Sequence, residues 1–442
     1  MNSGLPEAAA TVVEAGWVIP ADPPKAVLKD HAVVIDGGRI REVLPSRQAR
    51  ERYRDARRIE LPGHALIPGL INLHTHAAMA LMRGLADDRA LMDWLQNHIW
   101  PVEMRLVSSD FVYDGTLLAC AEMLRGGVTC FNDMYFFPEA AAQAALAAGM
   151  RAALGMIVIE MRSPYAADAG DYLSKGLAVR DALKHEPLLS FCLAPHAPFT
   201  VSDATLERVA TYAGELDVPV HIHLHETEDE IRQSVAAHGL RPLPRLKRLG
   251  VLGLNLIAVH AVHLTEDEIA LLAAHGCHVA HCPSSNLKLA SGFAPVAALH
   301  ERGVNVGLGT DGAASNNRLD VFSEMRLAAL LAKGVSGRAT ALSAHAVLGM
   351  ATLAAARALG IDDRVGSLAP AKCADMVAVN LCAPELAPCY DPLSHLVYAA
   401  GREHVSHVWV NGELLVEQGR LTRLDPAELA AKAAYWKEKI KG

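Results

Sequence analysis

ALIPGLINLHTH (65–76) ends a short apolar run with the histidine pair His74 and His76. Three later apolar runs end in the same way, at side chains that commonly bind metals: VPVHI (218–222) precedes His223 and Glu226, NLIAV (255–259) precedes His260, and VNVGLG (304–309) precedes Asp311. Each run is typical of a buried strand. Parallel strands that end in polar residues one after another indicate one rim of an α/β barrel, where the catalytic groups of that fold collect.

These strand ends form a candidate metal site. Three histidines and one aspartate supply nitrogen and oxygen ligands that suit Zn²⁺, and Glu226 is left over as a proton carrier. His74 and His76 are two residues apart, so on an extended strand both point to the same face and can reach one metal. Asp311 follows a strand and precedes a loop of small residues, a context unsuited to a core residue. The pattern predicts a metal-dependent hydrolase.

Single members of this set have simpler interpretations. The chain has 21 histidines, so an isolated H-x-H pair could be a surface or core feature. Glu226 could instead begin a helix, because the acidic run 226–230 would stabilise a helix N-terminus. The recurrence of such residues at strand ends favours the site. His196, which follows a strand in LAPHAPFT, is predicted to be a pocket residue, and His281 is a weaker candidate.

Composition narrows the class of protein. The 442 residues suffice for one barrel of roughly 250 residues and a smaller domain. A net charge of −8 offers no basic surface for nucleic acid or an anionic membrane. The apolar stretches are interrupted before membrane-spanning length, and the N-terminus lacks the pattern of a signal peptide. Eight cysteines without a C-x-x-C pair indicate free thiols, so we expect a cytoplasmic protein.

The two ends of the chain differ from its middle. Residues 26–60 and 407–422 each contain two β-rich runs joined by a turn, at Asp36-Gly37-Gly38 and Asn411-Gly412. Between 73 and about 345, strands alternate with alanine- and leucine-rich helical stretches such as 138–154 and 266–276, which predicts parallel βα units.

The predicted fold is therefore α/β, a (β/α)8 TIM-like barrel with a small β-sandwich domain built from both chain ends. The sandwich takes residues 1–67 and 367–424, and the barrel takes residues 68–366. Asp425 as N-cap and Pro426 at the first helical position predict a C-terminal helix over 425–442.

The motifs in this order resemble the amidohydrolase superfamily. PGLINLHTHAAMALMRGLADD (68–88) is similar to the opening of its aminohydrolase branch, which includes triazine and guanine deaminases and the 5′-methylthioadenosine/S-adenosylhomocysteine deaminases. The resemblance runs nearly end to end, through HIHLHET (221–227), AVHAVHL (258–264), HCPSSNLKL (281–289), GLGTDGAASNN (307–317) and GSLAPAKCADMV (366–377).

The resemblance implies a division of labour at the site. His74, His76, His223 and Asp311 would bind one divalent ion, Zn²⁺ or Fe²⁺. Glu226 would protonate a ring nitrogen as hydroxide adds, and His260 would orient the water. Asp311 would pass the proton of that water to the departing ammonia. Binuclear relatives use a carboxylated lysine at the end of the fourth strand. The corresponding stretch 188–199 offers His196 and no lysine, so one ion is expected.

The resemblance also implies a substrate. MDWLQNHIWPVE (92–103) is similar to the segment that supplies a tryptophan and a ribose-binding glutamate in nucleoside deaminases, which places these roles on Trp94 and Glu103. The alternative is an amphipathic helix with a core tryptophan. Relatives that act on S-adenosylhomocysteine hold its carboxylate with arginines; the equivalent stretch here places Met156 near that position, and Arg162 could substitute. An apolar residue there suits a methylthio tail.

The expected activity is deamination of adenine nucleosides that carry a 5′-thioether, by a homo-oligomer whose partner is this small molecule. A second hypothesis is a deaminase or chlorohydrolase of a free heterocycle such as guanine or a triazine. Trp94 and Glu103 favour the nucleoside, because a free base has no ribose diol. A third is a non-catalytic barrel scaffold, which predicts losses among six site residues that are all present.

Overall fold

Eight parallel strands form the larger body of the molecule. The computed structural model describes residues 10–253 and 255–442, so the first nine residues of the predicted sandwich lie outside the described part. The barrel strands, in their spatial order, are β5 (Leu70–Thr75), β6 (Val128–Asp133), β7 (Arg151–Val158), β8 (Leu189–Pro195), β9 (Val220–Leu224), β10 (Leu256–His260), β11 (His278–His281) and β12 (Asn305–Leu308). Most are buried along their whole length, which explains why apolar residues predominate in their sequences and why their polar residues concentrate near the strand ends.

The last strand returns to the first. The backbone N–H groups of Thr310 and Asp311, just after β12, both donate to the carbonyl of His74 in β5, at 3.1 and 3.0 Å. These bonds bring the two ends of the sheet together at the rim and leave a nearly closed barrel. The predicted fold class is confirmed.

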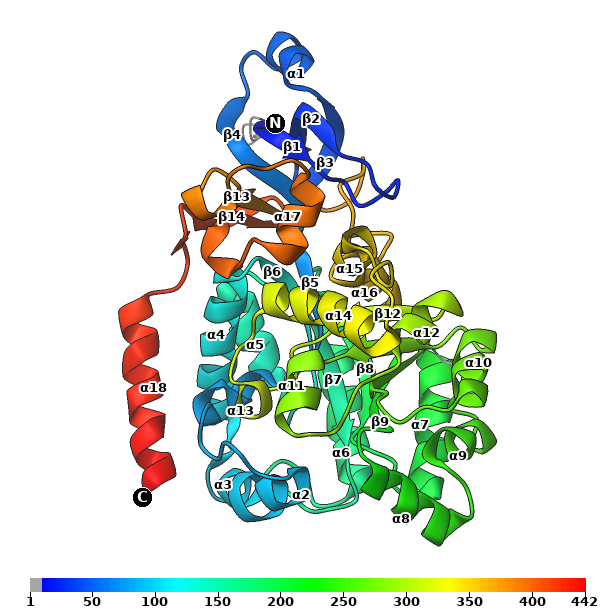
Figure 1. Ribbon diagram of the computed structural model, residues 1–442. Helices are drawn as coiled ribbons and strands as arrows, with labels where there is room; N and C mark the ends of the chain where they lie inside the picture. The colour runs from blue at the N-terminus through cyan, green and yellow to red at the C-terminus, as the bar shows by residue number, and fades with distance from the viewer. Residues whose placement is uncertain (1–9, 254) are drawn as a thin grey trace.

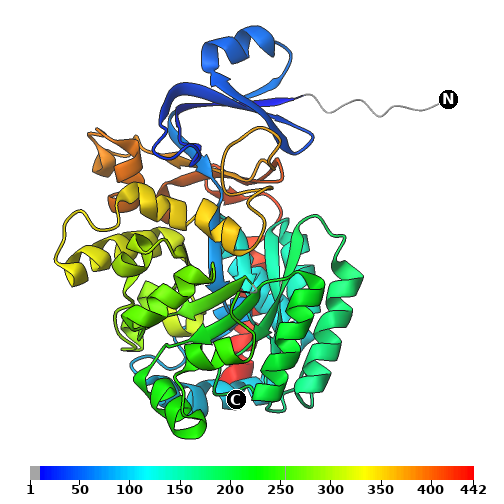
Figure 2. The same ribbon diagram turned by 90° about the vertical axis from the view of Figure 1, so that its right-hand side faces the viewer.

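Helices cover the outside of the barrel and its rim (Figure 1, Figure 2). They are η1 (Ala77–Met82), α2 (Leu91–Trp94), the π-helical turn η2 (Leu95–Ile99), α3 (Trp100–Leu106), α4 (Ser109–Arg125), α5 (Pro138–Ala148), α6 (Ala169–Leu183), α7 (Asp203–Leu216), α8 (Glu228–His238), α9 (Pro242–Arg248), α10 (Glu266–Ala274), α11 (Pro283–Lys288), α12 (Val296–Glu301), α13 (Ala313–Asn316), α14 (Val321–Ser336), α15 (Ala344–Met350) and α16 (Leu353–Ala358).

One predicted helix is too long. The sequence predicts a helix throughout 138–154, but α5 ends at Ala148 and β7 begins at Arg151. Gly149 ends the helix in the left-handed conformation, with φ of 73°. The alanines that follow occupy a fully buried strand, because pairing with β6 and β8 overrides their helix propensity.

The smaller body is a mixed sheet from both chain ends. Its strand order is β16-β15-β14-β13-β4-β1-β2-β3. The strands are β1 (Thr11–Val18), β2 (Leu28–Asp36), β3 (Arg39–Pro45), β4 (Arg57–Pro68), β13 (Met376–Asn380), β14 (Val405–Val410), β15 (Glu413–Glu417) and β16 (Arg420–Leu421). Short helices α1 (Ser46–Arg52), η3 (Pro384–Leu386), α17 (Pro392–Tyr398) and η4 (Arg402–His404) accompany them.

Both predicted hairpins are present, and their tips meet. A Cβ added to Gly412 would lie 2.7 Å from the Cα of Gly38, so the two turns approach too closely for a side chain there. The sheet therefore folds over a core that includes Val33, Ile40 and Trp409. The exact domain boundaries stay predictions, since β4 runs almost directly into β5.

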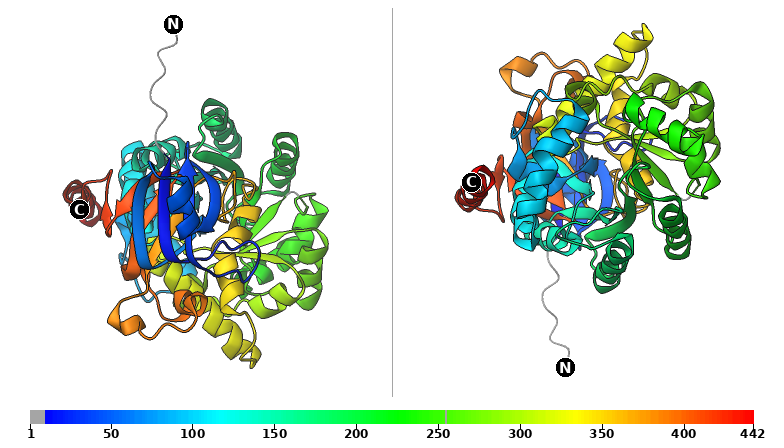
Figure 3. Two further views of the ribbon diagram at one scale, coloured as in Figure 1. Left: turned by 90° about the horizontal axis from the view of Figure 1, so that it is seen from above. Right: turned by 90° about the horizontal axis from the view of Figure 1, so that it is seen from below.

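The small sheet lies at the end of the barrel where the strands begin, so the opposite rim is free for a site (Figure 1). A buried ion pair joins the two bodies: Arg151 Nε of β7 lies 2.9 Å from Asp375 Oδ2, just before β13. The C-terminal helix α18 (Pro426–Lys441), capped by Asp425 as predicted, runs along α4 at the edge of the molecule (Figure 3).

Two further observations bear on the composition. All eight cysteines are free, and six of them are buried. Among the described residues, no helix combines the length and apolar character needed to cross a membrane.

Candidate active site

The predicted metal ligands and the predicted catalytic residue His260 converge at the rim where the strands end. His74 lies in β5 and His76 directly after it, His223 lies in β9, His260 ends β10, and Asp311 follows β12. His260 and Asp311 have positive φ angles, 68° and 59°. Left-handed backbone is strained for residues other than glycine and persists where a site over-determines it.

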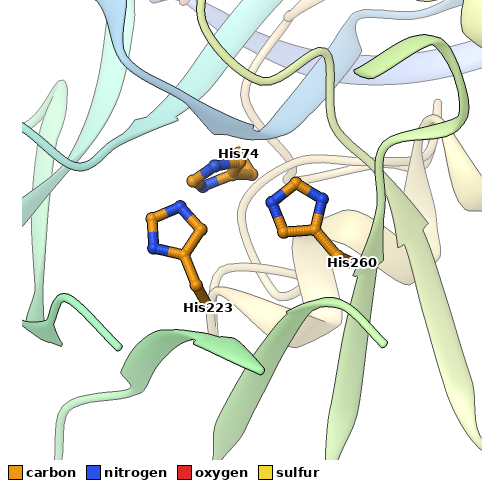
Figure 4. A group of neighbouring side chains, drawn as sticks. All are labelled: His74, His223 and His260. Atoms are coloured by element: carbon orange, nitrogen blue, oxygen red, sulfur yellow. The ribbon is translucent and has the colours of Figure 1, made fainter. Parts of the chain in front are cut away.

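The donor atoms of this cluster lie close together. Asp311 Oδ1 is 3.3 Å from His74 Nε2 and 3.2 Å from His76 Nε2. Ligand atoms of His74, His223 and His260 lie within 4.8 Å of one another, and the three rings face a common centre (Figure 4). His74 Nε2 is buried and forms no hydrogen bond with any residue of the described part of the chain. An orphaned imidazole nitrogen within a set of N and O donors fits a divalent ion.

The other ring nitrogen of each histidine has a partner. Nδ1 of His76 donates to the carbonyl of Met134 at 2.6 Å, and Nδ1 of His223 donates to the carbonyl of His196 at 2.7 Å. Nδ1 of His260 donates to Asn286 Oδ1 at 2.8 Å. Such partners fix the tautomer and ring orientation of metal-binding histidines, and here they leave Nε2 free to face the centre.

Asp311 is held as a carboxylate. The hydroxyls of Ser285 and Ser315 both donate to its Oδ2 at 2.6 Å, and the N–H of Gly312 donates to Oδ1 at 2.8 Å. Burial opposes its ionisation, but the contacts with His74 and His76 hold the pKa of Asp311 well below its usual range. Oδ1 is therefore presented, charged, to the cluster.

Glu226 lies beside the cluster and outside helix α8. Its Oε2 is 3.7 Å from His260 Nε2, and Ser291 Oγ donates to its Oε1 at 3.4 Å. Helix α8 begins at Glu228 with Thr227 as its cap, so Glu226 does not perform the alternative role of a helix-start residue. Burial raises the pKa of the Glu226 carboxyl above its ordinary value. That shift favours the protonated form of the carboxyl, the form that a general acid requires.

A cavity of about 220 Å³ opens onto the cluster. Its lining includes five of the predicted substrate contacts, Trp94, Glu103, His196, Glu226 and Arg162. Trp94 and Glu103 come from the segment that spans α2, η2 and α3. Glu103 is buried, and the phenol of Tyr135 donates to its Oε1 at 2.7 Å. Burial raises the pKa of Glu103 to about 7, although the Tyr135 hydrogen bond opposes this.

Met156 is not among the residues that line this cavity, and the expectation that it contacts a substrate tail is corrected. It packs against Gly176 of α6, where an added Cβ would lie 2.8 Å from the Met156 Cβ. Side chains alternate along β7, so its neighbour Ile157 lines the cavity instead, together with Ile159 just after the strand.

Several contacts were not anticipated. Tyr135 comes two residues after the end of β6, the same strand-end position that marks the other site residues, so the signal for it was available. Ser285 lies within the motif 281–289, but the sequence does not single it out from its neighbours. His221 lies two residues before His223 on β9, and its Nε2 is 3.0 Å from His74 Nδ1.

Comparison with known proteins settles the family. The model of the amidohydrolase family matches residues 65–415. The chain belongs to the amidohydrolase family. The resemblance drawn from its motifs is thereby confirmed, and the protein is a hydrolase of that family.

The family includes relatives that match over their full length. A protein from Teredinibacter turnerae named 5-methylthioadenosine/S-adenosylhomocysteine deaminase is 49% identical over 428 residues, 97% of each chain. A zinc-bound crystal structure of an adenosine deaminase from Xanthomonas campestris is 50% identical, with a TM-score of 0.96 over 98% of both chains. Atrazine chlorohydrolase from Arthrobacter aurescens, complexed with zinc, is 25% identical, with a TM-score of 0.89 over 97% of this chain and 100% of its own.

Proposed function

We propose that this amidohydrolase is a hydrolytic deaminase of adenine nucleosides that carry a 5′-thioether, and that it binds one Zn²⁺ per chain. The observation that carries the proposal is the position of Glu103, a buried carboxyl in the same cavity as the histidine–aspartate cluster. A carboxylate can accept hydrogen bonds from both hydroxyls of a ribose, and a free base offers no such group. The names of the relatives from Teredinibacter turnerae and Xanthomonas campestris support the same activity.

The ion would be held by His74, His76, His223 and Asp311. When bound, a zinc ion supplies a water that is nucleophilic at neutral pH. The described residues at the end of β8 offer His196 and no lysine, which supports a single ion. Fe²⁺ suits the same donor types, so metal analysis of the purified protein distinguishes the two.

The remaining residues have separate tasks. Glu226, with its raised pKa, holds the proton that goes to a ring nitrogen of the purine. His260, whose Nδ1 is tied to Asn286, presents Nε2 toward the attacking water and orients it. Asp311, fixed by Ser285 and Ser315, would accept a proton from the attacking water and pass it to the departing ammonia. Trp94 and His196 complete the walls around the base.

The 5′-substituent would lie toward the rim. Ile157 and Ile159 offer an apolar surface that suits a methylthio group. Arg162 is exposed at the edge of the cavity, and no ion-pair partner for it occurs within residues 10–253 and 255–442. This guanidinium is available for the carboxylate of a longer amino-acid tail. Arg162→Met should therefore lower turnover of S-adenosylhomocysteine while 5′-methylthioadenosine turnover changes little.

Ammonia release tests the proposal. The zinc-loaded protein should deaminate 5′-methylthioadenosine and adenosine, and 5′-methylthioadenosine should have the higher kcat/KM. Guanine should give no useful rate. Guanine or a triazine as the preferred substrate would instead establish the free-heterocycle alternative, which the structural similarity to atrazine chlorohydrolase keeps relevant.

A further inference from the structure

His74 differs from the other three histidines of the cluster in the partner of its Nδ1. His76 and His223 donate to backbone carbonyls and His260 to an amide oxygen, and all three acceptors can only accept. The partner of His74 is another imidazole, His221, with 3.0 Å between His74 Nδ1 and His221 Nε2. An imidazole nitrogen can donate or accept, so the tautomer of His74 depends on that of a second residue.

Metal binding fixes the direction of this hydrogen bond. An ion bound at His74 Nε2 requires the proton of the neutral ring to be on Nδ1. His74 must then donate, and His221 Nε2 must accept. The opposite direction leaves the proton of His74 on Nε2, the atom 3.3 Å from Asp311 Oδ1, where it would exclude the ion.

The structure also shows that His221 is a poor choice for stability alone. It is fully buried in the barrel, one layer below His223 on β9. If its Nε2 accepts, its proton lies on Nδ1, and that nitrogen is buried with no hydrogen-bond partner among the described residues. An unpaired buried polar group is unfavourable, and an aliphatic side chain at this interior position would avoid it.

We propose that His221 is a positioning residue that sets the tautomer of His74 and so tunes the affinity for the metal ion. The inference rests on the proposed metal site. It predicts that position 221 needs an acceptor at the place of Nε2, and that other properties of histidine are dispensable there. The amide oxygen of glutamine can occupy that place, whereas the amide of asparagine corresponds to Nδ1 and falls short.

The test is zinc titration of the metal-free full-length protein against a chromophoric chelator. His221→Gln should keep the dissociation constant within about threefold, while His221→Asn and His221→Leu should weaken zinc binding ~10–100-fold, as loss of such partners commonly does. A matched control is His278→Leu, because His278 also lies on a barrel strand and bonds a side chain, Asn305, but contacts no proposed ligand. That variant should bind zinc normally.

The outcomes distinguish the inference about His221 from the proposed metal site on which it rests. If His221→Asn binds zinc as tightly as His221→Gln, the inference about His221 is wrong. If His223→Ala also binds zinc like the wild type, the metal site itself is wrong. Urea unfolding of the metal-free variants provides a second measurement: a merely structural role would reduce stability in the Gln and Asn variants alike and would not divide their zinc affinities. The Gln–Asn comparison remains informative if the leucine variant does not fold.

Discussion

Glu226 combines burial with two contacts that keep it in place. Its backbone N–H donates to Glu230 Oε2 at 2.9 Å, and its side chain faces His260 Nε2 across 3.7 Å. Burial raises the pKa of Glu226, which favours the protonated carboxyl that a proton donor to the substrate requires. None of these contacts requires Glu226 to bind the metal.

Glu226→Gln therefore separates chemistry from metal binding. The amide keeps the shape but cannot transfer the proton, so kcat should fall at least ~10²-fold while zinc content is unchanged. Glu228→Gln, an exposed change two residues away on α8, is the control and should retain full activity. Near-normal turnover of Glu226→Gln would assign the proton transfer to another group.

At the scale of elements, α7 and α9 are joined through one carboxylate. Asp203, the first residue of α7, accepts from Arg245 Nε at 2.7 Å and from Arg248 Nη2 at 2.9 Å. Arg245 is buried and also donates to the carbonyls of Pro198 and Val201. Burial opposes the charge on Asp203, but the bond from Arg245 holds its pKa below the usual range.

The ion pair between Asp203 and Arg245 predicts that the stability of the protein depends on pH. A carboxyl whose pKa is lower in the folded state contributes stability above its unfolded value of about 3.9, and the contribution is lost as the pH falls through the folded pKa. Asp203→Asn should therefore lower the free energy of unfolding at pH 7, and the deficit should shrink as the pH falls below about 4. Urea unfolding at several pH values measures this. A deficit that stays constant down to pH 3 would show that the charge on Asp203 is unimportant.

The elements also show where sequence reasoning succeeds and where it fails. Strand ends such as His223 and His260 could be predicted because an apolar run and its terminal ligand are adjacent in the chain. The start of β7 could not, since alanine-rich sequences occur in helices and in strands buried on both faces. Because both faces of β7 are buried, its sequence does not alternate between apolar and polar residues. The sequence therefore does not show which side Met156 faces.

Over the whole molecule, the most useful signals were those repeated along the chain. Four strand ends with metal-type residues predict the barrel and its functional rim together, and two glycine turns predict the small sheet. Contacts between distant segments gave no such signal. His221 reaches His74 across 147 positions, and Arg151 reaches Asp375 across 224. Neither pair can be recognised without the fold.

The Arg151–Asp375 pair should be a principal link between barrel and sheet. Both side chains are almost fully buried, and Asp375 Oδ1 also accepts the N–H of Asn411 at 2.8 Å. Arg151→Met leaves a buried carboxylate without its cation and should cost about 3–5 kcal/mol in the free energy of unfolding. Adding Asp375→Asn should recover part of that loss. Arg47→Met, which removes an exposed ion pair with Glu51, is the control and should change stability little. A small effect of Arg151→Met would contradict the assignment.

The central claim is that the cavity recognises a nucleoside through Glu103, and one measurement tests it most directly. The kcat/KM for 5′-methylthioadenosine is compared with that for its 2′,3′-dideoxy analogue, in the wild type and in Glu103→Ala. Two charge-assisted hydrogen bonds of ~1.5–3 kcal/mol each predict that the wild type prefers the natural nucleoside at least ~10²-fold and that Glu103→Ala loses this preference. If Glu103→Ala deaminates 5′-methylthioadenosine as well as the wild type does, the cavity does not bind ribose in this way and the account is wrong.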